Sequence, residues 1–111
     1  KNKEFGPYDD VSRVSVSNKS SGFSYFDRNK NKWIVVVNEE EIGEYDTISE
    51  LMVSDNNYGF IYEKQGSWNI QIKDKTYGPY TMANRLFVYD NNIGFAYQEK
   101  GGFYFSLNPK E

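Results

Sequence analysis

The chain has 111 residues, a formal net charge of −3 at pH 7, and neither cysteine nor histidine. A chain of this length forms one core, so we expect a single domain over residues 1–111. Without cysteine and histidine, the chain has no disulfides, thiolate nucleophiles, imidazole catalysis or zinc sites built on the usual ligands. Its negative net charge argues against nucleic-acid binding. No apolar run approaches the ~20 residues that a membrane-spanning helix needs, so we expect no membrane insertion.

A short motif, an apolar residue followed by Gly, any residue and Tyr, opens the chain at residues 5–8 and recurs at 42–45 and 77–80. The glycines of the three copies are 37 and then 35 residues apart: Gly6, Gly43 and Gly78. Internal repeats of this length are typical of architectures built from one stacked supersecondary unit.

Three further patterns follow each copy of the motif in a fixed order. The first is an alternating apolar pair: Val14 and Val16, Leu51 and Val53, Leu86 and Val88. The second is Gly-Phe-x-Tyr, which begins at Gly22, Gly59 and Gly94. The third begins with an aromatic residue and alternates with aliphatic ones, from Trp33, Trp68 and Phe103. A period of two is that of half-buried strands, so the sequence predicts an all-β fold of three four-stranded antiparallel units. The units run approximately over 5–41, 42–76 and 77–111, with the Gly-x-Tyr strand first in each.

Two groups of acidic residues near the predicted turns are best explained by structural roles. Residues 27–32 place acidic or amide oxygens at alternate positions, as a calcium loop does, but they lack the bend glycine and carry interleaved lysines. We therefore interpret this segment as a hairpin loop and predict no metal site. Asp9 and Asp46 follow the tyrosine of the repeat, where we expect a hydrogen bond to a neighbouring strand.

The second unit carries the run Ser-Asp-Asn-Asn-Tyr-Gly-Phe-Ile-Tyr-Glu-Lys-Gln-Gly-Ser-Trp at residues 54–68. This run, together with residues 33–38 and 42–46, resembles the blade core of bacterial TolB-type, WD-like β-propellers. The resemblance implies four-stranded blades and a periplasmic, cell-envelope or extracellular setting in a bacterium. The third unit departs from the pattern, with Thr81, Tyr89 and Phe103 in place of Asp, Ser and Trp.

Three blades are fewer than the four to eight that close a propeller ring. The chain opens with a Gly-x-Tyr segment and ends where the next one is due, so our hypothesis is that two chains each donate an end strand and form a six-bladed homodimer. The alternatives are a fragment of a longer propeller, a trimeric nine-bladed ring, and a closed three-fold monomer of β-trefoil type, whose Gln-x-Trp signature is absent. Because the sequence begins at Lys1 rather than Met, we expect a processed or trimmed segment.

The candidate ligand-binding residues are the acid–amide turns that recur in the second and third units, with the adjoining tyrosine: Asp55, Asn56, Asn57, Tyr58, Asp90, Asn91 and Asn92. Turn formation alone explains Asn and Asp at such positions. As functional residues they would line one rim and hydrogen-bond a ligand. The sequence singles out no pair of carboxylates for catalysis. We therefore predict no catalytic, cofactor-binding or metal-ligating residues and expect that the protein is not an enzyme.

The leading hypothesis for function is a non-catalytic binding or scaffold module that contacts a protein or peptide through one rim or through the central channel. A carbohydrate-binding module that uses aromatic and amide side chains is the second hypothesis, because exposed Tyr and Trp with amide neighbours build many sugar sites. The third is a fragment of a larger propeller with no independent function.

Overall fold

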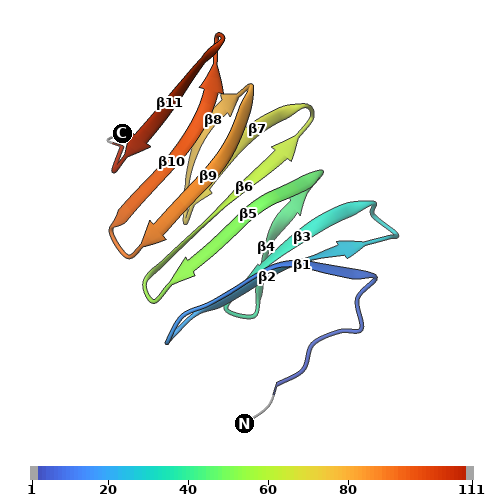
Figure 1. The fold of residues 1–111 in the computed structure, drawn as a ribbon. Helices are drawn as coiled ribbons and strands as arrows, with labels where there is room; N and C mark the ends of the chain where they lie inside the picture. Colours follow the sequence, from blue (N-terminus) through green and yellow to red (C-terminus); the bar gives the residue numbers. More distant parts are fainter. Residues whose placement is uncertain (1–2, 110–111) are drawn as a thin grey trace.

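The computed structural model describes residues 3–109, which fold into 11 β-strands with no helix among them (Figure 1). The strands are β1 (Asp10–Val16), β2 (Ser21–Asp27), β3 (Lys32–Val37), β4 (Glu40–Tyr45), β5 (Thr47–Ser54), β6 (Asn57–Lys64), β7 (Ser67–Ile72), β8 (Lys75–Tyr80), β9 (Met82–Tyr89), β10 (Asn92–Glu99) and β11 (Gly102–Leu107). All paired strands are antiparallel neighbours in the chain, joined by short hairpins. The predicted all-β class is confirmed.

The strands form three sheets, each a simple meander. Strands β1-β2-β3-β4 make the first sheet, β5-β6-β7-β8 the second and β9-β10-β11 the third. The prediction of four strands in every unit is wrong for unit 5–41, because residues 5–8 form no strand. The sheets also divide the strands differently from the predicted units, so the third sheet has three strands. The predicted phase is wrong as well: the Gly-x-Tyr segment at 42–45 lies in β4 and pairs with the preceding Trp strand, β3, so it ends a sheet rather than opening one.

The hairpins turn at residues that tolerate a left-handed backbone. Asn38, Lys73 and Asn108 occupy equivalent positions after the third strand of each sheet and have φ of 51°, 54° and 46°. Asparagine adopts positive φ more readily than most residues because its short amide can bond to the local backbone. The same end of every sheet therefore carries a tight, polar turn.

The first and second sheets pack face to face through one apolar cluster. Val35 and Val37 of β3 lie against Phe60 and Tyr62 of β6, and Val53 of β5 completes the contact. Phe60 is fully buried. Alternate residues of a strand point to opposite faces, so β6 uses its neighbouring isoleucine, Ile61, for the other side of the sheet.

The second and third sheets repeat this packing one unit later. Ile61, Ile70 and Ile72 of the second sheet contact Val88 and Phe95 of the third, which are equivalent to Val53 and Phe60.

The glycine of Gly-Phe-x-Tyr makes room for this contact. A Cβ on Gly59 would lie 2.7 Å from Ile72 Cδ1 and 3.0 Å from Val88 Cγ2, and one on Gly22 would lie 2.9 Å from Val53 Cγ1. The recurring glycine therefore lets a valine of the next sheet approach the strand.

The N-terminal segment forms no strand and covers the outer face of the first sheet instead. Tyr8 stacks on Tyr25 with ring centroids 4.2 Å apart, and Phe5 lies 6.2 Å from Phe23. Residues 3–9 thus run as an extended segment without the expected strand around residue 8 (Figure 1). The aromatic side chains of Phe5 and Tyr8 are nevertheless packed on the first sheet.

Removing the aromatic ring at the centre of the first junction should be costly. We expect Phe60→Ala to lower the free energy of unfolding by about 3–5 kcal/mol, because it leaves a cavity between two sheets. Phe60→Leu keeps most of the apolar volume and should cost less than about 1.5 kcal/mol. Urea unfolding monitored by tryptophan fluorescence measures both values, and equal losses for the two variants would contradict the packing described here.

Candidate functional site

The hairpins at one end of the three sheets form a polar surface, which we call the turn rim. It consists of the β1–β2, β3–β4, β5–β6, β7–β8 and β9–β10 turns together with Asn108 after β11. The β5–β6 and β9–β10 turns contain or adjoin the residues predicted to bind a ligand. The structure therefore brings these two repeated turns to one side of the molecule.

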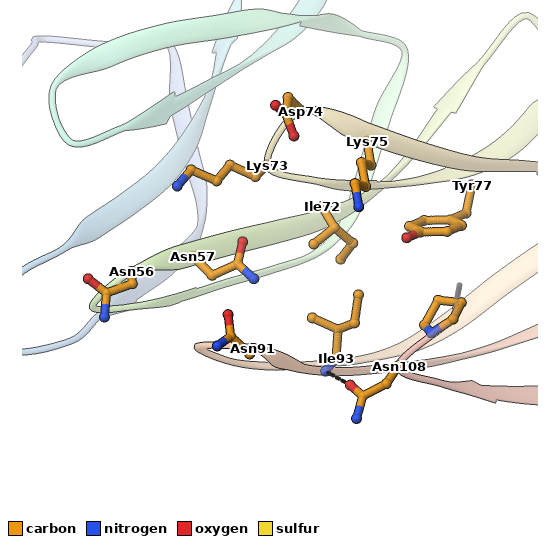
Figure 2. A pocket seen from close by; sticks show the side chains of 11 residues that line it. Asn56, Asn57, Ile72, Lys73, Asp74, Lys75, Tyr77, Asn91, Ile93 and Asn108 are labelled. Atoms are coloured by element: carbon orange, nitrogen blue, oxygen red, sulfur yellow. Dashed lines mark hydrogen bonds between the residues drawn. The ribbon is translucent and has the colours of Figure 1, made fainter. Parts of the chain in front are cut away.

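The turn rim contains a hollow at each junction between sheets. The first hollow, between the first and second sheets, has a volume of about 280 Å³ and is lined by Ser20, Asn38, Asp55, Asn56, Asn57, Tyr58 and Lys73. The second, between the second and third sheets, has a volume of about 310 Å³ (Figure 2). Its lining includes Asn56, Asn57, Lys73, Tyr77, Asn91 and Asn108.

The two hollows are built from equivalent positions of the repeat. Ser20 in the first corresponds to Asn57 in the second, Asn38 to Lys73, and Lys73 to Asn108. Because Lys73 and Asn57 line both hollows, the two sites adjoin each other along the rim. A ligand with a repeating polar backbone could therefore contact both at once.

Several of the predicted ligand residues are engaged within the protein. Asp55 Oδ1 accepts a hydrogen bond from the backbone N–H of Lys19 at 2.9 Å, and the Ser20 hydroxyl donates to the Asp55 carbonyl at 3.2 Å. The Ser17 hydroxyl and the Lys19 N–H together hold the pKa of the Asp55 carboxyl below its ordinary value. Asp55 therefore ties the first sheet to the second.

The equivalent turn ties the second sheet to the third. Asn57 Nδ2 donates to the Asp90 carbonyl at 2.6 Å, and the Asp90 N–H donates to the Ser54 hydroxyl at 2.8 Å. Tyr58 donates its hydroxyl to the Lys73 carbonyl at 3.1 Å, and burial raises its pKa. Asn92 Oδ1 accepts from Asn108 Nδ2 at 3.3 Å. These four candidates (Asn57, Tyr58, Asp90 and Asn92) hold the turns in place.

Asn56 and Asn91 differ from the other candidates. Both are exposed, they occupy the same position of the repeat, and their carboxamides make no hydrogen bond within residues 3–109 (Figure 2). A free carboxamide offers two donors and an acceptor. Among the seven predicted residues, these two present free carboxamides at the turn rim.

Sequence reasoning missed the residues that the β7–β8 turn and the end of β11 contribute to the rim. Lys73, Tyr77 and Asn108 line the second hollow without belonging to the acid–amide turns. The signal that could have found them is the turn that follows each Trp-type strand, where Asn38 and Asn108 occupy equivalent positions.

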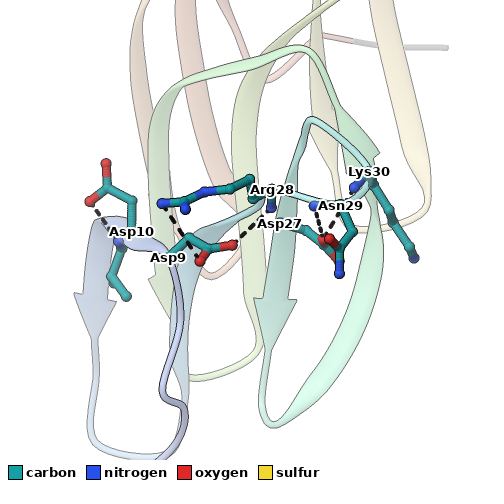
Figure 3. Close-up of polar contacts among 7 residues, drawn as sticks. Asp9, Asp10, Asp27, Arg28, Asn29 and Lys30 are labelled. Atoms are coloured by element: carbon teal, nitrogen blue, oxygen red, sulfur yellow. Dashed lines mark hydrogen bonds and ion pairs between the residues drawn. The ribbon is translucent and has the colours of Figure 1, made fainter.

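The acidic residues of the repeat bond to hairpin loops, whereas we expected a hydrogen bond to a neighbouring strand. Asp9 Oδ2 accepts a hydrogen bond from the backbone N–H of Arg28 at 2.9 Å (Figure 3). Asp46 Oδ2 accepts one from the backbone N–H of Gln65 at 2.8 Å, so each carboxylate holds the loop between the second and third strands of a sheet. Lys32 also bonds to Asp46 and, with the Gln65 N–H, lowers the pKa of that carboxyl.

Residues 27–32, which place oxygens at alternate positions as a calcium loop does, form the β2–β3 hairpin turn. Asp27 Oδ1 accepts from the backbone N–H groups of Asn29 at 2.9 Å and Lys30 at 3.2 Å (Figure 3). The Lys30 ammonium bonds Glu44 at 2.8 Å. Within residues 3–109 no group of three or more acidic side chains is arranged to hold a metal ion.

A third hollow lies along the first strands of the sheets, away from the turn rim. Its volume is about 520 Å³, and it is lined by Arg13, Val14, Ser15, Ser49, Glu50, Leu51, Met52 and Leu86. Arg85 Nη1 lies 3.8 Å from Glu50 Oε2 beside it. Arg13, Glu50 and Arg85 occupy the same repeat position, so β1, β5 and β9 present a row of alternating charge.

Comparisons of the chain with protein-family models, with curated proteins and with solved structures found no match. Among residues 3–109, no helix has the length and apolar character needed to cross a membrane.

The role of Asp55 can be tested by pH. A carboxyl whose pKa is lowered in the folded state stabilises that state above its unfolded pKa of about 4 and loses this effect as pH falls through the folded value. We expect Asp55→Asn to lower the urea midpoint at pH 7 and to differ less from the wild type at pH 3. Asp74→Asn, in an exposed turn, is the charge-matched control. A difference that stays constant from pH 7 to pH 3 would contradict the proposed ties.

Proposed function

We propose that this chain is part of a TolB-like β-propeller of bacterial type, completed to six blades by a second copy, and that it serves as a non-catalytic module for binding a protein or peptide. The support for the propeller is the equivalence of the two junctions: the same repeat positions bury the same kinds of side chain between sheets one and two and between sheets two and three. A structural unit that stacks in this way extends naturally into a ring.

The support for peptide binding is the pair of free carboxamides on the turn rim. Asn56 and Asn91 recur at adjoining hollows, and each can exchange hydrogen bonds with the N–H and C=O groups of an extended peptide. Lys73, shared by the two hollows, adds a positive charge. These features favour a polar peptide segment that carries an acidic side chain.

The aromatic residues favour a peptide over a sugar. Sugar sites use an exposed ring face, whereas the ring of Tyr58 lies parallel to Phe60 and that of Tyr77 packs 5.3 Å from Phe95. The position equivalent to Tyr58 in the second hollow is Ile93, so the aromatic residue does not repeat with the amides. Carbohydrate binding remains the second candidate, because the amides alone could also bind hydroxyl groups.

Peptides selected from a random phage-displayed library against the wild-type protein provide the test. We expect the double variant Asn56→Ala/Asn91→Ala to bind the selected peptides at least about tenfold more weakly, which corresponds to ~1.4 kcal/mol. Its thermal unfolding should be unchanged, because both side chains are free. Titration calorimetry measures the affinities.

The matched control is Asn29→Ala, an exposed asparagine in the β2–β3 loop at the opposite end of the sheet. Equal affinities of the wild type and the double variant would contradict the rim site. A thermal-shift screen with monosaccharides and disaccharides separates the second candidate. If a sugar stabilises the wild type but not the double variant, the rim site binds a carbohydrate rather than a peptide.

A further inference from the structure

One face of the first sheet is exposed. The equivalent repeat positions are buried in the second and third sheets. Val16 is 72% exposed, whereas its equivalents Val53 and Val88 are 6% and 2% exposed. Val53 and Val88 are covered because a preceding sheet packs on them. The first sheet thus presents the surface that, at the two junctions, receives a neighbouring sheet.

The third sheet exposes the complementary face. Phe105 is 66% exposed, whereas its equivalent Ile70 is fully buried against the following sheet. Gly94 corresponds to Gly22 and Gly59, the glycines that make room for a valine of the next sheet. The third sheet therefore has the apolar surface found at the two junctions and, at Gly94, the space that admits a valine of the next sheet. Val16 is the valine of the first sheet that is equivalent to Val53 and Val88.

The third sheet also has a free edge where the others have a fourth strand. In the second sheet this strand is β8, whose Tyr80 stacks on Tyr97 of the next sheet with centroids 4.0 Å apart. Tyr8 makes the equivalent stack on Tyr25 at 4.2 Å, but residues 5–8 pair with no strand. Gly6 and Gly78 even share a positive φ, of 109° and 127°. The N-terminal segment therefore packs on the first sheet as the fourth strand of the second sheet packs on the third.

We infer that residues 3–8 of one copy of this chain form the fourth strand beside β11 of a second copy, and that the third sheet of each copy covers the first sheet of the other. This inference rests on the proposed propeller and names the occupant of its two open faces. Two such junctions complete a ring of six blades, within the range of four to eight that propellers adopt.

A second copy fits these faces because one chain carries both halves of the junction. The face that receives (Val16 and Phe23) and the face that supplies (Gly94 and Phe105) match the pairs already joined within the chain. The junction between copies would differ at one charged position: Arg85 would lie near Arg13 of the other copy, whereas within the chain the equivalent pair is Glu50 and Arg85. The Arg85 side chain is largely exposed, so salt screens this repulsion.

The register of the added strand follows from the second sheet. There Gln71 pairs with Thr76 across β7 and β8, and their side chains are in hydrogen-bond contact at 2.7 Å. The equivalent positions are Ser106 of one copy and Glu4 of the other. These two side chains should lie directly opposite each other in the completed sheet.

The chain has no cysteine, so a disulfide can report this pair without interference. We expect the variant Glu4→Cys/Ser106→Cys to oxidise to a covalent dimer of twice 13.0 kDa on a non-reducing gel. Two controls calibrate the geometry. Gln71→Cys/Thr76→Cys should form a bond within one chain and stay monomeric, and Glu4→Cys/Phe105→Cys should not cross-link, because Phe105 points to the opposite face of β11.

A covalent monomer alone, a ladder of higher species, or equal cross-linking of the Phe105 control would overturn the inference. The result is independent of the rim, since neither position lies in a hollow. Loss of peptide binding with an intact dimer would therefore reject the proposed rim site alone. Peptide binding without a dimer would reject the exchanged strand, and with it the six-bladed ring completed by a second copy, but not the rim site.

Discussion

The structure depends on apolar packing between sheets of three or four short strands. A sheet of this size buries little surface by itself, and its stability comes from a partner that covers its apolar face. Val53 and Val88 fill the same place at the two junctions, each opposite a glycine that allows close approach. The repeated residues of the sequence thus make the same contact at each junction. The stability of a sheet depends on the apolar face that packs against it.

The turn rim follows from the same constraint. Stacking the sheets in register brings their hairpins together, and the polar turn residues then bond from one sheet to the next. Asp55 and Asn57 show this role most directly, because each bonds to the backbone of a neighbouring sheet. The middle residue of each turn is Asn56 in one and Asn91 in the other. Its carboxamide makes no hydrogen bond within residues 3–109. The rim therefore combines fixed geometry with free amide groups, which is what a preorganised binding surface requires.

Much of this could be predicted from the sequence, since alternation and turn residues located every strand that the structure contains. The phase of the sheets could not, because a Gly-x-Tyr strand has the same local pattern whether it opens one sheet or closes the preceding one. Only pairing partners decide this, and Trp33 opposite Tyr45 supplies the answer. In the candidate site, recurrence of the turn predicted Asn56 and Asn91, and both line a hollow of the turn rim. It could not separate them from Asp55 or Asn57, because hydrogen bonds between sheets are not visible in a sequence.

If both exposed faces of the chain belong to one kind of junction, two copies should associate in solution. The mass of the wild-type protein, measured by light scattering after size exclusion over a range of concentrations, tests this most directly. We expect a mass near twice 13.0 kDa that falls toward that of a single chain only on dilution. A mass of one chain at every concentration would contradict it, because the exposed faces of the first and third sheets would then have no second copy to cover them.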